Sequence, residues 1–208
     1  MTRTSSVRAA ILVAGMALGM WPAAAQANLI VNPSFEAPAI PGGTFSILLV
    51  IPGWTTSSGP GIEIQNNVAG APNSGSQHVE LDSFSNSAMF QDVPTTLGQG
   101  YTLSFFYSPR PGVSAASNPI EVWWNGSLID TITGVGGGVT SWTEHVYTVF
   151  GSAGPDTTLL FAAAGTSESL GGYLDDVSVE AVPEPGTLLL LGSGLTSLAL
   201  RRRRRQNS

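Results

Sequence analysis

The chain of 208 residues contains no cysteine and no lysine. Without cysteine it has no disulfide framework, no thiolate metal site and no thiol nucleophile. Seven of its eight basic residues, all arginines, fall in residues 1–27 or 183–208, which leaves Arg110 as the only one between them. A protein that binds nucleic acid needs clustered lysine and arginine against the phosphates, so this composition excludes that function.

Residues 28–182 are strongly acidic. They hold 13 of the 14 aspartates and glutamates, so their net charge is −12, against −6 for the whole chain. A surface of this charge favours solubility, cation binding or neutral ligands. The stretch of about 155 residues suits one domain with a single core.

A helical period of apolar residues is also missing from residues 28–182. Short β-branched and aromatic runs recur between clusters of glycine, proline, asparagine and serine, a pattern typical of an all-β sandwich. Asn125-Gly126 is a strong hairpin signal because both residues tolerate positive φ. The predicted strands are Leu29–Val31, Phe45–Val50, Ile62–Gln65, His78–Leu81, Ala88–Val93, Tyr101–Tyr107, Ile120–Trp124, Leu128–Ile132, Trp142–Phe150, Thr157–Ala163 and Tyr173–Glu180.

Residues 1–27 have the parts of a secretory signal peptide. Arg3 and Arg8 give a basic region, Ala9–Met20 is apolar and uncharged, and Ala25 and Ala27 are small residues where a signal peptidase reads the chain. We expect signal peptidase to cleave before Asn28 and the remainder to be exported.

Residues 183–208 combine a proline-rich start, an apolar run and a basic cluster. The two prolines of Pro183-Glu184-Pro185 cannot continue a strand. The uncharged residues from Gly186 to Leu200 would span about 22 Å as a helix, short of the roughly 30 Å hydrocarbon core. Arg201–Arg205 then favour the cytoplasmic side. This order predicts a short transmembrane helix that acts as a membrane anchor; a core helix is the alternative.

These ordered features resemble the PEP-CTERM sorting signal of bacterial envelope proteins. The resemblance implies that Pro183, Glu184 and Pro185 form a sorting motif and that an exosortase, a membrane transpeptidase-like enzyme, recognises and processes the tail. It implies a location in the cell envelope or outside the cell, with transient or permanent anchoring in the inner membrane.

A second resemblance covers residues 28–182. Asn32-Pro33-Ser34-Phe35-Glu36 and the later run Gly172–Val179 are similar to the two ends of galactose-binding-like jelly rolls, which include many carbohydrate-binding modules and the DUF642-type cell-wall proteins. The resemblance implies a jelly-roll β-sandwich. It also implies that Glu36 and Asp176 share one structural Ca²⁺, completed by backbone carbonyls and water. The alternative is that both residues cap turns. Strand alternation places Asp175 and Asp176 on opposite faces.

Polar and aromatic side chains supply the candidate ligand-binding residues. Period two puts His78, Glu80 and Asp82 on one strand face, which is either ligand-binding or solvated. Arg110 has donors for a sugar hydroxyl, a sugar carboxylate or an internal acid. Aromatic rings stack on sugar C–H faces, although most are core residues in a domain of this size. The candidates are Trp54, Glu80, Tyr107, Arg110 and Trp123.

No local signature of an enzyme accompanies these residues. There is no G-x-S-x-G elbow, phosphate loop or haem motif, and His145 is too far from His78 in sequence to indicate zinc. We therefore expect a non-catalytic, exported envelope or matrix protein, and the two resemblances imply that it binds carbohydrate, with exopolysaccharide as its partner. The alternative is a structural or adhesion protein of the matrix without specific glycan binding.

Overall fold

The computed structural model of the chain describes residues 27–183, Gly192 and Gly194. The predicted signal peptide, apart from Ala27, and the predicted sorting tail, apart from Pro183 and two glycines, lie outside the described residues. In the part that is described, no helix is long and apolar enough to cross a membrane.

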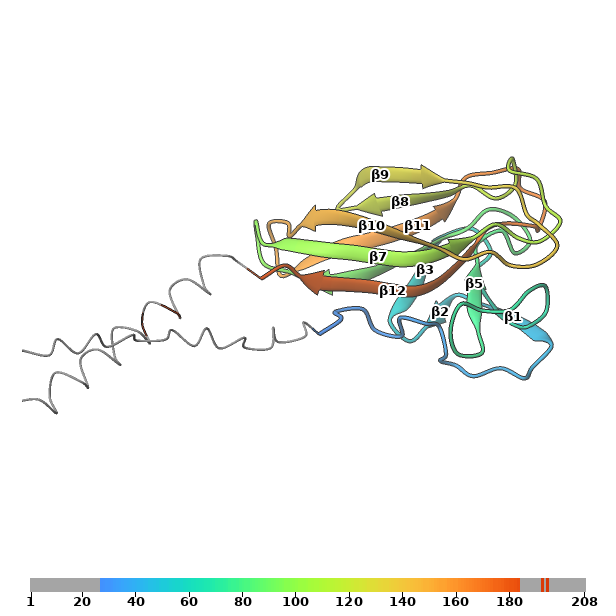
Figure 1. Cartoon of the computed structure of the whole chain (residues 1–208), viewed down its shortest axis with the longest axis horizontal. Helices are drawn as coiled ribbons and strands as arrows, with labels where there is room; N and C mark the ends of the chain where they lie inside the picture. Colours follow the sequence, from blue (N-terminus) through green and yellow to red (C-terminus); the bar gives the residue numbers. More distant parts are fainter. Residues whose placement is uncertain (1–26, 184–191, 193, 195–208) are drawn as a thin grey trace, which may run out of the picture.

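Residues 27–183 form two antiparallel sheets of six strands each, packed face to face (Figure 1). We call them sheet A and sheet B. The order in sheet A is β1 (Thr44–Leu48), β4 (Ile62–Asn66), β5 (His78–Glu80), β12 (Tyr173–Ala181), β7 (Gly100–Ser108) and β10 (Thr143–Phe150). The order in sheet B is β2 (Val50–Ile51), β3 (Trp54–Ser58), β6 (Ala88–Pro94), β11 (Asp156–Ala163), β8 (Ile120–Trp124) and β9 (Ser127–Ile132). The predicted all-β jelly-roll sandwich is confirmed.

Most predicted strands coincide with observed ones, with three differences. Leu29–Val31 is not a strand, although Leu29 N donates to Val179 O at 2.9 Å. The predicted strand Phe45–Val50 is divided between β1 and β2. β3 was not among the predicted strands, because four of its five residues are Thr or Ser. The predicted hairpin at Asn125-Gly126 is confirmed, with φ of 50° and 74° between β8 and β9.

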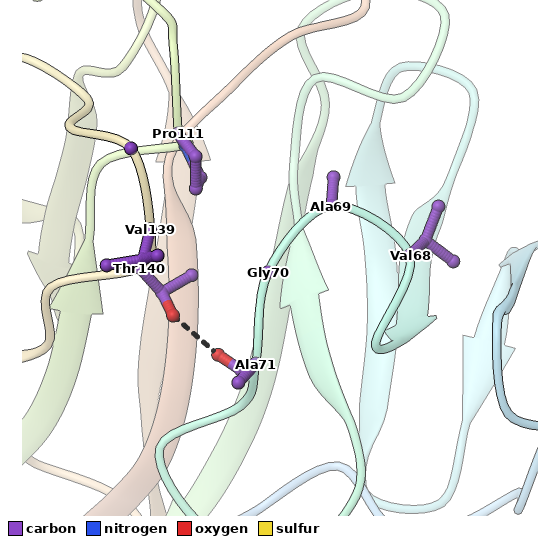
Figure 2. Close-up of a pocket in the computed structure, with 8 residues that line it drawn as sticks. Val68, Ala69, Gly70, Ala71, Pro111, Val139 and Thr140 are labelled. Carbon is purple, nitrogen blue, oxygen red and sulfur yellow. Dashed lines mark hydrogen bonds between the residues drawn. The ribbon is translucent and has the colours of Figure 1, made fainter.

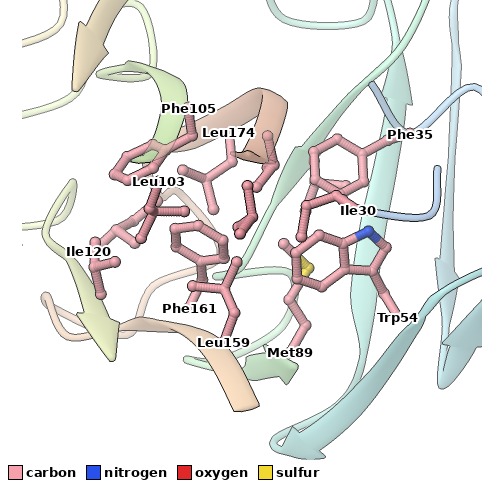
Figure 3. Packing of buried hydrophobic residues seen from close by; sticks show 14 of the residues in the cluster. Ile30, Phe35, Trp54, Met89, Leu103, Phe105, Ile120, Leu159, Phe161 and Leu174 are labelled. Carbon is pink, nitrogen blue, oxygen red and sulfur yellow. The ribbon is translucent and has the colours of Figure 1, made fainter. Parts of the chain in front are cut away.

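The hydrophobic core lies between the sheets and is built around aromatic side chains (Figure 3). Trp54 contacts Phe35 and Phe161, with ring centroids 5.6 and 6.0 Å apart, and Phe161 meets Phe105 edge-on at 5.0 Å. All four are fully buried. Burial of one such ring contributes about 1.5–3 kcal/mol, so this cluster is a main source of stability in a fold without disulfides.

The outer face of sheet A is closed over at one end of the sandwich. In β4, Ile62 and Ile64 point into the core, while Glu63 and Gln65 alternate outward yet remain buried. The segments that follow β4, β7, β9 and β11 meet at this end of the sandwich, on the right in Figure 1. They convert an outer sheet face, which is commonly wet, into a buried polar layer.

Candidate ligand-binding site

The centre of this layer is a carboxyl pair held by three donors. Glu63 and Glu80 lie directly opposite each other on β4 and β5. Gln65 Nε2 donates to Glu63 Oε1 at 2.9 Å and to Glu80 Oε2 at 2.5 Å. Gly171 N donates to Glu80 Oε1 at 2.6 Å, and Arg110 Nη1 forms a salt bridge with Glu80 Oε2. Glu80 is fully buried, so the pair is an internal structure and is not open to solvent.

Burial controls the electrostatics of this pair. It raises the pKa of Glu80 to about 8, against the opposing effect of the Arg110 charge. Burial likewise raises the pKa of Glu63. Arg110 also lies over the Tyr173 ring, with its Cζ 6.0 Å from the ring centroid. Within the described residues, Nη1 is the only guanidinium nitrogen with a hydrogen bond, while the backbone N of Arg110 donates to Asn118 Oδ1 at 3.0 Å.

His78 is a packed imidazole. Its ring lies 4.4 Å from the Tyr173 ring and 5.7 Å from the Trp142 ring, and the side chain is fully buried. Neither ring nitrogen has a hydrogen-bond partner among the described residues. Burial, followed by the charge of Arg110, lowers the pKa of His78 to about 4. The imidazole is therefore neutral at pH 7.

Residues 67–72, which we call the strap, cross above these rings. Thr140 Oγ1 and Trp142 Nε1 both donate to Ala71 O at 3.0 Å, and Tyr173 Oη donates to Ala69 O at 3.3 Å. Between the strap and the segments around Pro111 and Thr140 lies an open cleft of about 430 Å³ (Figure 2). Its lining consists of Val68, Ala69, Gly70, Ala71, Pro111, Gly138, Val139 and Thr140.

The structure brings two of the five predicted ligand-binding residues together and separates the other three. Glu80 and Arg110 form the salt bridge, and Pro111, the residue after Arg110, lines the cleft. Trp123 is half-buried on sheet B, where its Nε1 donates to Glu121 at 3.0 Å. The five residues do not form one site.

Trp54 and Tyr107 are corrections to the sequence analysis. Trp54 is fully buried and Tyr107 is 3 % exposed, and both belong to the core between the sheets. Their polar atoms are used internally, since Trp54 Nε1 donates to Asn32 O and Tyr107 Oη donates to Asn118 O. Neither ring can reach a ligand in this structure. The sequence did contain a signal for the burial of Tyr107, because strand alternation places it on the same face as Leu103 and Phe105.

Sequence reasoning missed the cleft itself. Its lining is glycine, alanine, proline, valine and threonine, residues that carry no chemical signature. Trp142 lies beside the cleft, where its Nε1 donates to Ala71 O, and it was among the aromatic residues considered for sugar stacking but not among the five candidates. The one available signal was the density of small residues in 68–71 and 136–138, which is typical of loops that approach other backbone closely.

The two predicted calcium ligands both accept hydrogen bonds from residues 73–77. Glu36 Oε1 accepts from Ser76 N at 2.7 Å and Gln77 N at 2.9 Å. Asp176 Oδ1 accepts from Ser74 Oγ at 2.6 Å and Oδ2 from Asn73 Nδ2 at 2.7 Å. Both carboxylates therefore have hydrogen-bond donors from this segment without a cation. Among the described residues no group of three or more His, Asp or Glu side chains is placed to hold a metal. Calcium binding stays a prediction.

The prediction that Asp175 and Asp176 point to opposite faces of the sheet is wrong. The register between β12 and β7 shifts between Asp175 and Ser178, and Asp176 adopts a left-handed φ of 48°. As a result both carboxylates contact the same segment, since Asp175 Oδ2 accepts from Asn73 N at 2.8 Å and Ser74 N at 3.1 Å. Burial raises the pKa of Asp175 to about 7.

Comparison with known proteins identifies the C-terminal stretch. Residues 181–205 match the PEP-CTERM protein-sorting motif. Over 153 residues, or 72% of its length, the chain is 29% identical to a multifunctional-autoprocessing repeats-in-toxin protein of Vibrio vulnificus. The matched part is 3% of that toxin's length.

Solved structures share the fold of residues 27–183. A Stig cyclase, FisC, from Fischerella sp. TAU aligns with 75% of this chain and 97% of its own, at 14% identity and a TM-score of 0.54. TmCBM61, solved in complex with β-1,4-galactotriose, aligns with 75% of this chain and 99% of its own, at 13% identity and a TM-score of 0.48. The similarity to FisC concerns the fold alone, and since a cyclase has this fold, the fold does not decide between catalysis and binding.

Proposed function

We propose that the chain is an exported protein whose β-sandwich binds carbohydrate without catalysis, and that exosortase processing at the sorting motif delivers it to the cell envelope or the extracellular matrix. The observation that carries the proposal is the cleft at the loop end of the sandwich, in a chain whose residues 181–205 match a sorting motif. Its volume of about 430 Å³ falls within the range of small-ligand pockets, roughly 300–1,000 Å³.

The lining of the cleft suits a sugar. Val68, Pro111 and Val139 provide apolar contacts for C–H faces, while the Thr140 hydroxyl and the peptide groups of glycines 70 and 138 provide polar contacts for hydroxyls. The net charge of −12 on residues 28–182 disfavours polyanions. We therefore propose a neutral polysaccharide as the ligand.

The absence of catalysis is supported by what lines the cleft. None of its eight lining residues has a titratable side chain. General acid–base chemistry needs such a group within hydrogen-bond reach of the reacting atoms. Glu63 and Glu80 are buried and already hydrogen-bonded, so neither presents a free carboxylate to a substrate.

A structural or adhesion role is the second candidate. It is favoured by the covered end of the outer face of sheet A, where Arg110 and Tyr173 close over Glu80. A domain with this closed face serves as a compact, acidic spacer.

Titration calorimetry with the purified protein separates the two roles. Neutral and acidic polysaccharides are titrated in the presence of calcium and again with EDTA. Saturable binding to a neutral glycan supports carbohydrate binding. Heats indistinguishable from dilution for every glycan contradict it and leave the structural role.

A further inference from the structure

Three exposed apolar side chains lie together at the end of the sandwich opposite the cleft. Leu97, Phe150 and Val182 are 69%, 61% and 40% exposed. Phe150 is opposite Gly100 in the β10–β7 register, and a Cβ built on Gly100 would lie 3.8 Å from both Phe150 Cε1 and Val182 Cβ. Leu97 forms a β-bridge with Gly151, the neighbour of Phe150. We call these three side chains the terminal patch.

The terminal patch is connected to the apolar run of the sorting segment by a very short linker. Val182 belongs to the patch, and Pro183-Glu184-Pro185-Gly186 is all that separates it from the apolar run that begins at Thr187. Five Cα–Cα steps from Val182 to Thr187 span at most about 18 Å when fully extended. A bilayer adds roughly 5–8 Å of headgroup region on each side of its hydrocarbon core. With the run inserted, the patch is held within reach of the headgroups.

The start of the domain also lies near the end of the sandwich at which β12 terminates. Asn28 Nδ2 donates to Val177 O at 3.0 Å and Leu29 N donates to Val179 O at 2.9 Å. β12 ends at the left of Figure 1, whereas the segments that border the cleft lie at the right. A domain that is attached to the membrane at the end where β12 terminates therefore directs its cleft away from the membrane.

We propose that Leu97, Phe150 and Val182 are a lipid-contact surface that seats the sandwich on the bilayer while the C-terminal segment is attached. This inference rests on the exosortase sorting in the proposed function, with the apolar run of the tail inserted in the membrane, but not on carbohydrate binding. Lipid is the occupant that the charges favour, because two copies with net charge −12 each repel one another. Glu180 is exposed two residues before Val182, so zwitterionic headgroups are preferred over anionic ones.

Single-cysteine labelling tests the proposal, because the chain has no cysteine of its own. Leu97→Cys and Phe150→Cys report on the patch. Val135→Cys, 74% exposed and close to the cleft end, is the matched control. Each variant of the exported chain is purified from a host without exosortase, labelled with the environment-sensitive dye NBD and reconstituted into phosphatidylcholine vesicles at fewer than one copy per vesicle. We expect a blue shift of emission, and its loss with doxyl-labelled lipids, at positions 97 and 150 but not at 135.

Every other outcome overturns the proposal in a recognisable way. Water-like emission at all three positions shows that the patch does not touch lipid. A blue shift that needs several copies per vesicle identifies a second copy as the occupant. Failure of the protein to float with the vesicles removes the membrane premise. Glycan binding measured on the same samples reports separately on the carbohydrate part of the proposed function.

Discussion

Arg110 and Glu80 form a salt bridge in the covered layer of sheet A, and Arg110 is the only cationic side chain that residues 28–182 contain. The charge of Arg110 favours the ionised form of one of two adjacent buried carboxyls, Glu63 and Glu80, and so opposes the effect of burial on the pKa of Glu80. A buried ion pair is a weak source of net stability, but removing one partner leaves the other charge uncompensated.

We expect Arg110→Met to lower the free energy of unfolding by about 3 kcal/mol at pH 9. The pKa of Glu80 is already raised to about 8, so its stabilising contribution is complete below pH 4.5 and is lost as pH rises through 8. Without Arg110 the pKa of Glu80 rises further. The loss of unfolding free energy caused by Arg110→Met is therefore smaller at pH 5.5, where Glu80 is protonated. Urea unfolding at the two pH values measures this. Glu80→Gln added to Arg110→Met is the control and should recover stability at pH 9; an equal loss at both pH values contradicts the charge argument.

We expect His78→Phe to reduce the acid sensitivity of the fold. The pKa of His78 in the folded state, about 4, lies below the reference value of 6.5. The stability that the neutral imidazole contributes is therefore present above pH 6.5 and is lost as pH falls toward 4. The shift corresponds to about 3 kcal/mol across that window. Phe keeps the ring contacts with Tyr173 and Trp142 and removes two unpaired nitrogens. Thermal melts from pH 7 to pH 4 should therefore show a smaller decline for the variant. His145→Phe is the control, because His145 is only half-buried, and an equal benefit from both changes would contradict the prediction.

We expect Gly138→Trp to abolish glycan binding without lowering the melting temperature. Gly138 lines the cleft, no atom lies within 4 Å of the position of its missing Cβ, and its φ is not left-handed, so the indole enters the cleft without backbone strain. Gly137→Trp is the matched control, since Gly137 is also exposed but does not line the cleft. Calorimetric titration with the best neutral glycan measures the effect. Retained binding in Gly138→Trp would place the glycan elsewhere.

The calcium prediction has a direct test. A Ca²⁺ shared by Glu36 and Asp176 predicts that EDTA lowers the melting temperature of the wild-type protein but not that of Asp176→Asn, since binding to the native state is linked to its stability. The hydrogen bonds of Asp176 to Ser74 and Asn73 operate without a cation and predict no EDTA effect in either protein. Differential scanning calorimetry before and after chelation distinguishes the two, and an unchanged wild-type melt contradicts the calcium prediction.

The strands were predictable where one face of a strand is uniformly apolar. Tyr101, Leu103 and Phe105 alternate with half-buried residues in β7 and face the core, as expected. β3 could not be found in this way, because the residues after Trp54 are small and polar and their strand state depends on pairing with β6. Local propensity carries no information about that pairing.

The candidate site was predictable in its parts but not in its arrangement. An internal acid was one of three partners that the sequence offered for Arg110, and thirteen acids were available. The choice of Glu80 depends on how the segment after β7 folds over sheet A. Alternation failed at Asp175 and Asp176, because a β-bulge turns both carboxylates toward one segment. Such irregularities depend on tertiary contacts, which a period-two pattern does not contain.

The Arg110–Glu80 salt bridge has a further consequence outside the cell. Proteases of the trypsin type cleave after a lysine or arginine that enters their acidic specificity pocket. In residues 28–182 the only lysine or arginine available to such a protease is Arg110. Its side chain is 17% exposed and forms a salt bridge with Glu80, and the next residue is Pro111. In the proposed processed form, which lacks the arginines in residues 1–27 and 183–208, the folded domain presents no accessible cleavage site to this class of enzyme, and this suits the proposed place in an extracellular matrix.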